Sequence, residues 1–236
     1  MSKRKKRWTN FLPRKAKALP KLMIQWCNYQ NFLINMATPA VFIIVDTSVL
    51  LSFICSNNEK FLLIFTQESP LYVPETIDNE MARKLKESRF KHGRKTWETL
   101  KSSQRVEVLE DNLVTLLPII RGWAGPRFGL QHGLAKNLGE YVGIAHCIIR
   151  QDNNRKNKST EKVAIILDDG DGAELARKRQ IMSFSSEQVL LRAVQLGRLP
   201  SRGAAKKVWE QLRKYDEHIP FEDTKLSDRT LYQRDS

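Results

Sequence analysis

The sequence predicts an α/β fold in which a central, mostly parallel β-sheet is flanked by helices in three layers. Two runs carry most of this prediction, Val41–Val45 (VFIIV) and residues 163–167 (VAIIL). A short, wholly apolar run rich in β-branched residues is typical of a strand that is covered on both faces. Helical patterns separate the predicted strands, and strands that alternate with helices indicate a parallel sheet.

The other elements follow from the same patterns and from the turn residues between them. Four glycines, at positions 122, 125, 129 and 133, and Pro126 indicate mostly loop in 113–136, and the polar run 151–162 indicates another loop. The expected elements after the first strand are a helical stretch to residue 65, a strand at 71–73, helices at 75–87 and 95–103, a strand at 106–109, a helix at 138–150, the strand at 163–167, a helix at 173–179, a strand at 181–184, and helices near 186–196 and 202–215.

Charge divides the chain. The 236 residues carry a formal net charge of +14. Residues 1–40 hold nine Lys and Arg and no acid, so the remainder holds 31 basic against 26 acidic residues. We therefore expect a basic N-terminal arm at 1–39, a folded domain at 40–215 and a polar tail at 216–236. Both basic parts suit a polyanionic partner, because neutralised phosphates release counterions.

Three interpretations of the arm remain open. It is a nucleic-acid-binding tail, a targeting segment, or sequence upstream of a true start at Met36, which leads directly into the first strand.

The three cysteines are too far apart for a CxxC zinc motif or a disulfide framework, which favours the cytoplasm. The apolar run Val41–Val45 is far shorter than the roughly 18 residues that suggest a membrane span, so no membrane association is expected.

Carboxylates follow the two apolar strands directly. Asp46 comes after the first, and Asp168, Asp169 and Asp171 come after the strand at 163–167. If these strands are neighbours, the acids meet at the carboxyl edge of the sheet, where open parallel sheets bind ligands. Hard oxygen ligands of this kind suit Mg²⁺ or Mn²⁺. Each acid also has a plainer explanation as a helix N-cap or a turn residue.

Two further acids lie on predicted helices. Glu80 stands at the edge of the apolar stripe formed by Ile77 and Met81, and Glu140 shares a face with Ile144 and Ile148. An unpaired charge on a core-facing side is costly to bury, which suggests a function. Alone, Glu80 could be a solvated helix-edge charge, and Glu140 could simply favour the helix N-terminus through the dipole.

Taken in order, the segments IVDTSVL, VPETIDNEM, LGEYVGIAHC and IILDDGDGAELARKRQI resemble a PIN-domain ribonuclease, similar to VapC-type toxins of toxin–antitoxin pairs. The resemblance spans about residues 41–185. It implies that Asp46, Glu80, Glu140 and Asp169 are catalytic and that Asp46, Glu140 and Asp169 bind Mg²⁺ or Mn²⁺. Ser48 would support Asp46, and Asp168 and Asp171 could assist or replace Asp169.

The resemblance implies metal-dependent hydrolysis of RNA phosphodiester bonds. It also suggests a small antitoxin protein as partner, and a homodimer. The alternative is a PIN-fold module that binds or regulates RNA without cutting it. A haloacid-dehalogenase-like phosphatase fits less well, since it needs a second acid where this chain has Ser48.

Basic residues before Trp97 suggest where RNA would bind. We expect contacts from Arg89, Lys91, Arg94 and Lys95, with Trp97 as a stacking ring. The competing interpretation is a solvated helix face with Trp97 in the core. The four histidines are scattered, and His146, in an apolar helix, is expected to be structural.

Overall fold

The computed structural model describes residues 40–67, 69–125, 128 and 137–233. All of the described residues belong to the larger of the two units of the chain, Ala40–Ser236. The predicted basic arm therefore lies outside the described residues. In the larger unit, five parallel strands form a single sheet in the order β3-β2-β1-β4-β5, which confirms the predicted α/β class.

The elements of this unit follow the expected alternation of strands and helices. The first half contains β1 (Val41–Val45), α2 (Thr47–Cys55), α3 (Lys60–Phe65), β2 (Leu71–Pro74), α4 (Glu75–Lys84), η1 (Lys91–Gly93), α5 (Arg94–Ser102), β3 (Val106–Leu109) and α6 (Leu113–Ala124). The second half contains α7 (Leu138–Asn157), β4 (Lys162–Ile166), α8 (Gly170–Lys178), β5 (Met182–Phe184), α9 (Ser186–Gln195), α10 (Arg202–Leu212), η2 (Phe221–Asp223), η3 (Lys225–Ser227) and η4 (Arg229–Tyr232).

The centre of the sheet is the pair β1 and β4, and its register decides where the acids stand. All five residues of β1 are buried, as the apolar sequence predicts. Val45 is level with Ile166, and the amide of Asp46 donates a 2.9 Å hydrogen bond to the Ile166 carbonyl. Because the two strands are parallel and adjacent, the acids after each of them meet at one edge of the sheet.

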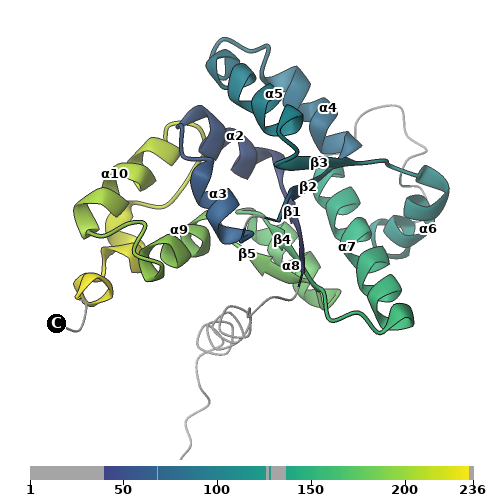
Figure 1. The fold of residues 1–236 in the computed structure, drawn as a ribbon. Coiled ribbons are helices and arrows are strands. Elements are labelled where there is room, and N and C mark those ends of the chain that lie inside the picture. Colours follow the sequence, from purple (N-terminus) through teal and green to yellow (C-terminus); the bar gives the residue numbers. More distant parts are fainter. Residues whose placement is uncertain (1–39, 68, 126–127, 129–136, 234–236) are drawn as a thin grey trace, which may run out of the picture. The chain divides into compact units, whose positions relative to one another are not determined.

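Helices cover both faces of the sheet (Figure 1). On one face α3 packs against α9 and α2 against α10, whereas on the other α7 contacts α6, α8 and strands β1, β2 and β4. The connection from β1 to β2 contains α2 and α3, whereas the connections from β3 to β4 and from β4 to β5 run in the opposite direction along the sheet and contain α6, α7 and α8. Right-handed crossovers in opposite directions place their helices on opposite faces. Helix α4 contacts both α2 and α7. It therefore brings together helices that belong to opposite layers.

The segment 113–136 was expected to be mostly loop, and for its first half this prediction was wrong. Helix α6 occupies Leu113–Ala124, with Asn112 as its N-cap and Pro118 inside it. Leu116 and Ile120 are spaced four residues apart and are buried together with residues of α7. This apolar stripe outweighs the glycines: Gly122 lies inside the helix, which ends at Gly125 with a φ of 93°.

Two more expectations need correction. Residues 151–162 are not wholly a loop, because α7 continues to Asn157 and is stabilised there by Arg150, which binds Glu161 with two hydrogen bonds of 2.6 and 2.7 Å. The expected polar tail from residue 216 contains three short 3-10 helices, and Phe221 and Leu226 in it are fully buried. Among the described residues, no helix is both long and apolar enough to cross a membrane.

Candidate active site

Asp46 lies between the end of β1 and the start of α2. Its Oδ2 atom caps the helix, accepting hydrogen bonds from the Ser48 amide at 3.1 Å and from the Ser48 hydroxyl at 2.9 Å. Burial raises the pKa of Asp46 above its usual 3.8, although these hydrogen bonds oppose the shift. The N-cap explanation is thus correct, and Ser48 supplies both of these hydrogen bonds. Capping involves only one of the two carboxylate oxygens.

Asp169 repeats this arrangement at the end of β4. It is the N-cap of α8, and its Oδ2 accepts a 2.7 Å hydrogen bond from the amide of Gly172. In both acids the capping bond fixes the carboxylate and leaves oxygen lone pairs for another ligand. The plain and the functional explanations of these residues are therefore compatible.

Glu140, in the first turn of α7, is affected by the charges of four other acids. Its pKa is raised to about 7, first by burial and then by the negative charges of Asp46, Asp169, Asp171 and Glu80. Five carboxylates from four segments are thus close enough to repel one another. Such a cluster is stabilised when it holds protons or a cation.

Two glycines lie close to these carboxylates. A Cβ atom added at Gly172 would stand 2.8 Å from Oε2 of Glu140, a separation that real Cβ atoms do not show. A Cβ at Gly139 would lie 3.7 Å from Oε2 of Glu80 and 3.9 Å from Oδ1 of Asp46. The absence of a side chain at Gly172 lets α8 approach the Glu140 carboxylate of α7, whereas the distances at Gly139 are ordinary contacts that show how near Glu80 and Asp46 lie to the start of α7.

The acids open into a cavity of about 840 Å³. Asp46, Glu80 and Glu140 form part of its wall, while Asp169 and Asp171 are not among its lining residues. Of the four predicted RNA-binding residues, Arg89 lines the cavity. Lys91, Arg94 and Lys95 are exposed, on η1 and α5, and do not line it. Trp97 is 1% exposed, and its Nε1 donates to Asp78 at 3.1 Å, so it belongs to the core and cannot stack on RNA.

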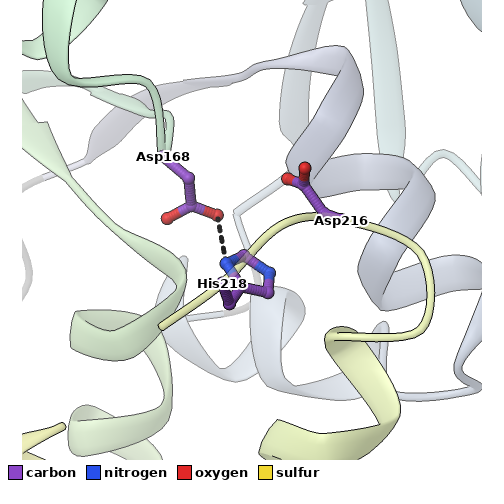
Figure 2. A group of neighbouring side chains, drawn as sticks. All are labelled: Asp168, Asp216 and His218. Carbon is purple, nitrogen blue, oxygen red and sulfur yellow. Dashed lines mark ion pairs between the residues drawn. The ribbon is translucent and has the colours of Figure 1, made fainter. Parts of the chain in front are cut away.

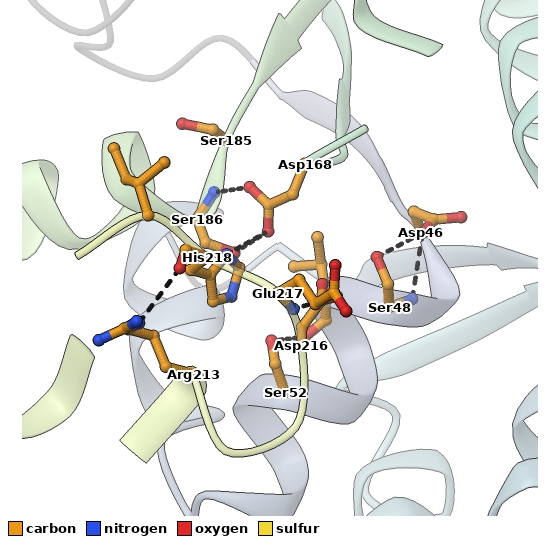
Figure 3. A network of polar contacts seen from close by, with 12 residues as sticks. Asp46, Ser48, Ser52, Asp168, Ser185, Ser186, Arg213, Asp216, Glu217 and His218 are labelled. Atoms are coloured by element: carbon orange, nitrogen blue, oxygen red, sulfur yellow. Dashed lines mark hydrogen bonds and ion pairs between the residues drawn. The ribbon is translucent and has the colours of Figure 1, made fainter. Parts of the chain in front are cut away.

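Asp168 does not join this cluster. Its carboxylate accepts hydrogen bonds from the amide and the hydroxyl of Ser186, at the start of α9 (Figure 3). Burial raises the pKa of Asp168, and the nearby His218 opposes the rise. Although Asp168 lies only two residues after the end of β4, its side chain faces another part of the molecule. The prediction that Asp168 could assist Asp169 as a metal ligand does not fit this geometry.

Asp168 instead belongs to a second group with Asp216 and His218 (Figure 2). One ligand atom from each of the three lies within 4.8 Å of the others. The Nδ1 atom of His218 is 3.9 Å from Oδ2 of Asp168, and the His218 side chain is only 4% exposed. These contacts tie the segment after α10 to the end of β4, so we regard the group as a structural clamp.

Sequence reasoning missed three residues near the site. Thr47 binds Glu80 directly, and Tyr215 lines the cavity from the segment after α10. Asp111 follows β3 and holds α4 and α7 together, accepting hydrogen bonds from the Thr76 amide at 2.6 Å and from His146 at 2.7 Å. The rule that identified Asp46, an acid placed just after a strand, could have found Asp111. His146 is structural, as expected.

Comparison with protein-family models, with curated proteins and with solved structures gave no match for this chain.

Proposed function

We propose that this protein is a metal-dependent endoribonuclease with a PIN-like domain. The observation that carries the proposal is the position of Glu140, whose pKa is raised to about 7 by burial and by four surrounding carboxylates. A protein that only needed a stable fold would gain nothing from this repulsion. The cluster lies at the carboxyl edge of a parallel sheet, where such folds bind ligands.

The donor set fits a divalent cation. Asp46, Glu140 and Asp169 would hold it, with Glu80 and Asp171 near enough to help. All are carboxylates, the ligand type that Mg²⁺ and Mn²⁺ prefer. The close approach of Glu140 to Gly172 supports this assignment, since it leaves no room there for a side chain. When bound, such a cation polarises a phosphate and lowers the pKa of a water molecule.

The residues of this chain supply the remaining parts of the mechanism. Ser48 holds the carboxylate of Asp46, and Thr47 holds that of Glu80, so both acids are oriented before substrate arrives. The basic side chains on the cavity wall, Arg83, Lys84 and Arg89, favour a polyanion there. We propose RNA as this polyanion, in keeping with the resemblance to PIN-domain ribonucleases. The antitoxin partner and the homodimer stay predictions.

Cleavage of a labelled single-stranded RNA by the purified protein tests the proposal. We expect cleavage with Mg²⁺ or Mn²⁺, none with EDTA, and none from Asp46→Asn, which keeps the size of the side chain but weakens cation binding. Ser48→Ala is the matched variant, and it should retain part of the activity because Asp46 itself remains. RNA binding without cleavage by the wild type would favour the non-catalytic module, and undiminished cleavage by Asp46→Asn would reject the assigned site.

A further inference from the structure

The cavity has a second wall, opposite in chemical character to the carboxylates. Arg89 and Phe90, from the segment between α4 and η1, line it together with Tyr215 from the segment after α10. Arg89 and Tyr215 are far apart in the chain, but Nη2 of Arg89 donates a 2.7 Å hydrogen bond to the carbonyl of Lys214, the residue before Tyr215. A guanidinium and an aromatic ring thus stand beside the proposed catalytic carboxylates.

Tyr215 is held in place by its neighbours. Its ring centroid lies 6.3 Å from that of Phe90 and 5.5 Å from that of His92. The Nε2 atom of His92 lies 2.8 Å from the Cys55 carbonyl and 3.1 Å from the Tyr215 hydroxyl. Because a carbonyl can only accept, the 2.8 Å contact places the proton on Nε2, so the Tyr215 hydroxyl cannot donate its hydrogen to that atom. The hydroxyl hydrogen of Tyr215 is then available to a ligand in the cavity.

Arg89 is the cation on this wall that is best placed to bind a phosphate. Arg83 pairs with Glu80 at 3.5 Å, and Lys84 pairs with Glu87 at 3.4 Å. Within the described part of the chain, no carboxylate lies within ion-pair distance of the exposed Arg89. Its guanidinium rests over the Phe90 ring, 5.1 Å from the centroid, and uses one of its five N–H groups on Lys214.

The segment that carries Tyr215 is anchored at both ends (Figure 3). On one side the Tyr215 amide donates to the Leu212 carbonyl at 2.9 Å. On the other, the carbonyl of His218 accepts from Arg213 at 3.1 Å, and the His218 ring contacts Asp168 and Trp209. The aromatic wall is therefore preorganised, which reduces the entropy that a ligand would lose on binding.

We propose that Arg89, Phe90 and Tyr215 form a subsite for one nucleotide of a single-stranded RNA, next to the phosphate that is cut. A base stacks on the ring of Tyr215, and Arg89 binds a phosphate. The ring of Phe90 packs against both side chains and holds them in place. This inference rests on the proposed function. A nucleotide fits better than an acidic peptide, because a flat ring and a guanidinium together match a base and its phosphate. The cavity volume of about 840 Å³ is sufficient for such a ligand.

Affinity for short RNA in EDTA tests the subsite without cleavage. The probes are a labelled five-nucleotide RNA and matched versions in which one base at a time is removed, and the protein is the full chain. The basic residues of 1–39 contribute to the binding of all probes alike, so the ratio of affinities isolates the base. We expect wild type to prefer the intact RNA over one of the abasic probes by roughly tenfold, as stacking on an aromatic ring implies.

Two substitutions at Tyr215 assign this preference to the ring. Tyr215→Phe keeps the ring and should keep the preference, whereas Tyr215→Leu should reduce the ratio to about one because no stacking surface remains. An equal preference in wild type and Tyr215→Leu would overturn the subsite, and so would a wild type that binds every abasic probe as tightly as the intact RNA. The abasic probes on wild type do not depend on the folding of any variant.

The role of Arg89 is tested by the salt dependence of binding. Arg89→Ala should weaken binding several-fold and lower the slope of log affinity against log salt by about 0.7, the value for one phosphate contact on a single strand. Lys207→Ala, at an exposed position of α10 outside the cavity lining, is the charge-matched control. Equal effects of the two substitutions would reject the contact.

The two proposals can fail separately. A preference for the intact base without metal-dependent cleavage would refute the proposed nuclease activity but keep the subsite. Metal-dependent cleavage without a base preference would keep the nuclease activity but refute the subsite.

Discussion

The hydroxyl of Thr47 donates a 2.8 Å hydrogen bond to Oε2 of Glu80. Thr47 is the first residue of α2, next to Asp46, and Glu80 lies on α4, so the bond joins two acid-bearing segments 33 residues apart. Thr47 is 5% exposed, which protects the bond from competing water. The orientation of Glu80 thus depends on a residue beside Asp46.

Thr47→Val should impair metal binding while the fold persists. Valine has nearly the shape of threonine but lacks the hydroxyl, so Glu80 loses its donor. A hydrogen bond to a charged group contributes ~1.5–3 kcal/mol, and we expect cleavage at limiting Mg²⁺ to fall roughly tenfold. Thr47→Ser restores the hydroxyl and should restore activity. Metal titrations of cleavage rate check this, and equal rates for the valine and serine variants would contradict it.

Gly172→Ala should affect the site, and Gly170→Ala should not. Both glycines are in the first turn of α8. A Cβ at 172 would come within 2.8 Å of Glu140 Oε2 and displace it, whereas a Cβ at 170 meets nothing within 4 Å. Alanine favours the helix by up to ~1 kcal/mol in either case. Isothermal titration with Mn²⁺ should show weaker binding for Gly172→Ala alone; matching affinities in the two variants would argue against the position of Glu140.

The strands and their acids could be predicted because each signal is local. VFIIV and VAIIL are wholly apolar and therefore central, and the topology of a parallel sheet places Asp46 and Asp169 at the same edge. Glu80 and Glu140 came from helical spacing together with the PIN-domain resemblance. Glu80 and Glu140 lie near Asp46 and Asp169 because α4 and α7 pack near that edge of the sheet.

What the sequence did not reveal depends on distant partners. The bonds of Thr47 to Glu80 and of Asp111 to His146 join residues 33 and 35 positions apart, and no spacing rule links them. Asp168 and Asp169 are adjacent and chemically identical. Only the packing of α9 and His218 decides that Asp168 turns away from the cluster. Helix α6 was missed because its glycines were given more weight than the four-residue spacing of Leu116 and Ile120.

Glu140→Gln should stabilise the metal-free protein at high pH. The folded-state pKa of about 7 exceeds the ordinary 4.5, so the folded state holds the proton more tightly. Stability from this group is complete below pH 4.5 and is lost as the pH rises towards 7. Glutamine stays neutral and avoids this loss. After allowance for solvent screening at this half-buried site, we expect the variant to gain about 1 kcal/mol in unfolding free energy at high pH. Urea unfolding in EDTA at pH 5 and pH 8 should show the gain only at pH 8, and a less stable variant at pH 8 would exclude carboxylate repulsion.

Asp111→Asn should loosen the contact between α4 and α7. Burial alone would raise the pKa of Asp111, but hydrogen bonds from His146 and Thr76 outweigh it and hold the pKa below 3.8. The stabilisation is therefore present above pH 3.8 and is lost as the pH falls through the lowered value. We expect a loss of ~1–3 kcal/mol at pH 7. Glu110→Gln, at the exposed neighbouring position, should change the unfolding free energy by less than ~0.5 kcal/mol. A loss that does not diminish in acid would point to a cause other than the carboxylate charge.

Substitution of the two adjacent acids after β4 should separate metal binding from structure. Asp169→Asn should abolish metal-dependent cleavage, because Asp169 faces Glu140 and its charge contributes to the raised pKa there. Asp168→Asn should keep cleavage within about threefold of the wild type at saturating substrate, as expected for a residue that touches no reacting atom. Its effect should instead appear as lower stability and faster amide hydrogen exchange around residues 213–221, since the clamp with His218 and Ser186 is weakened. Loss of cleavage in Asp168→Asn with unchanged exchange in that segment would instead indicate that Asp168 is a metal ligand. It would also contradict the structural role assigned to its contacts with His218 and Ser186.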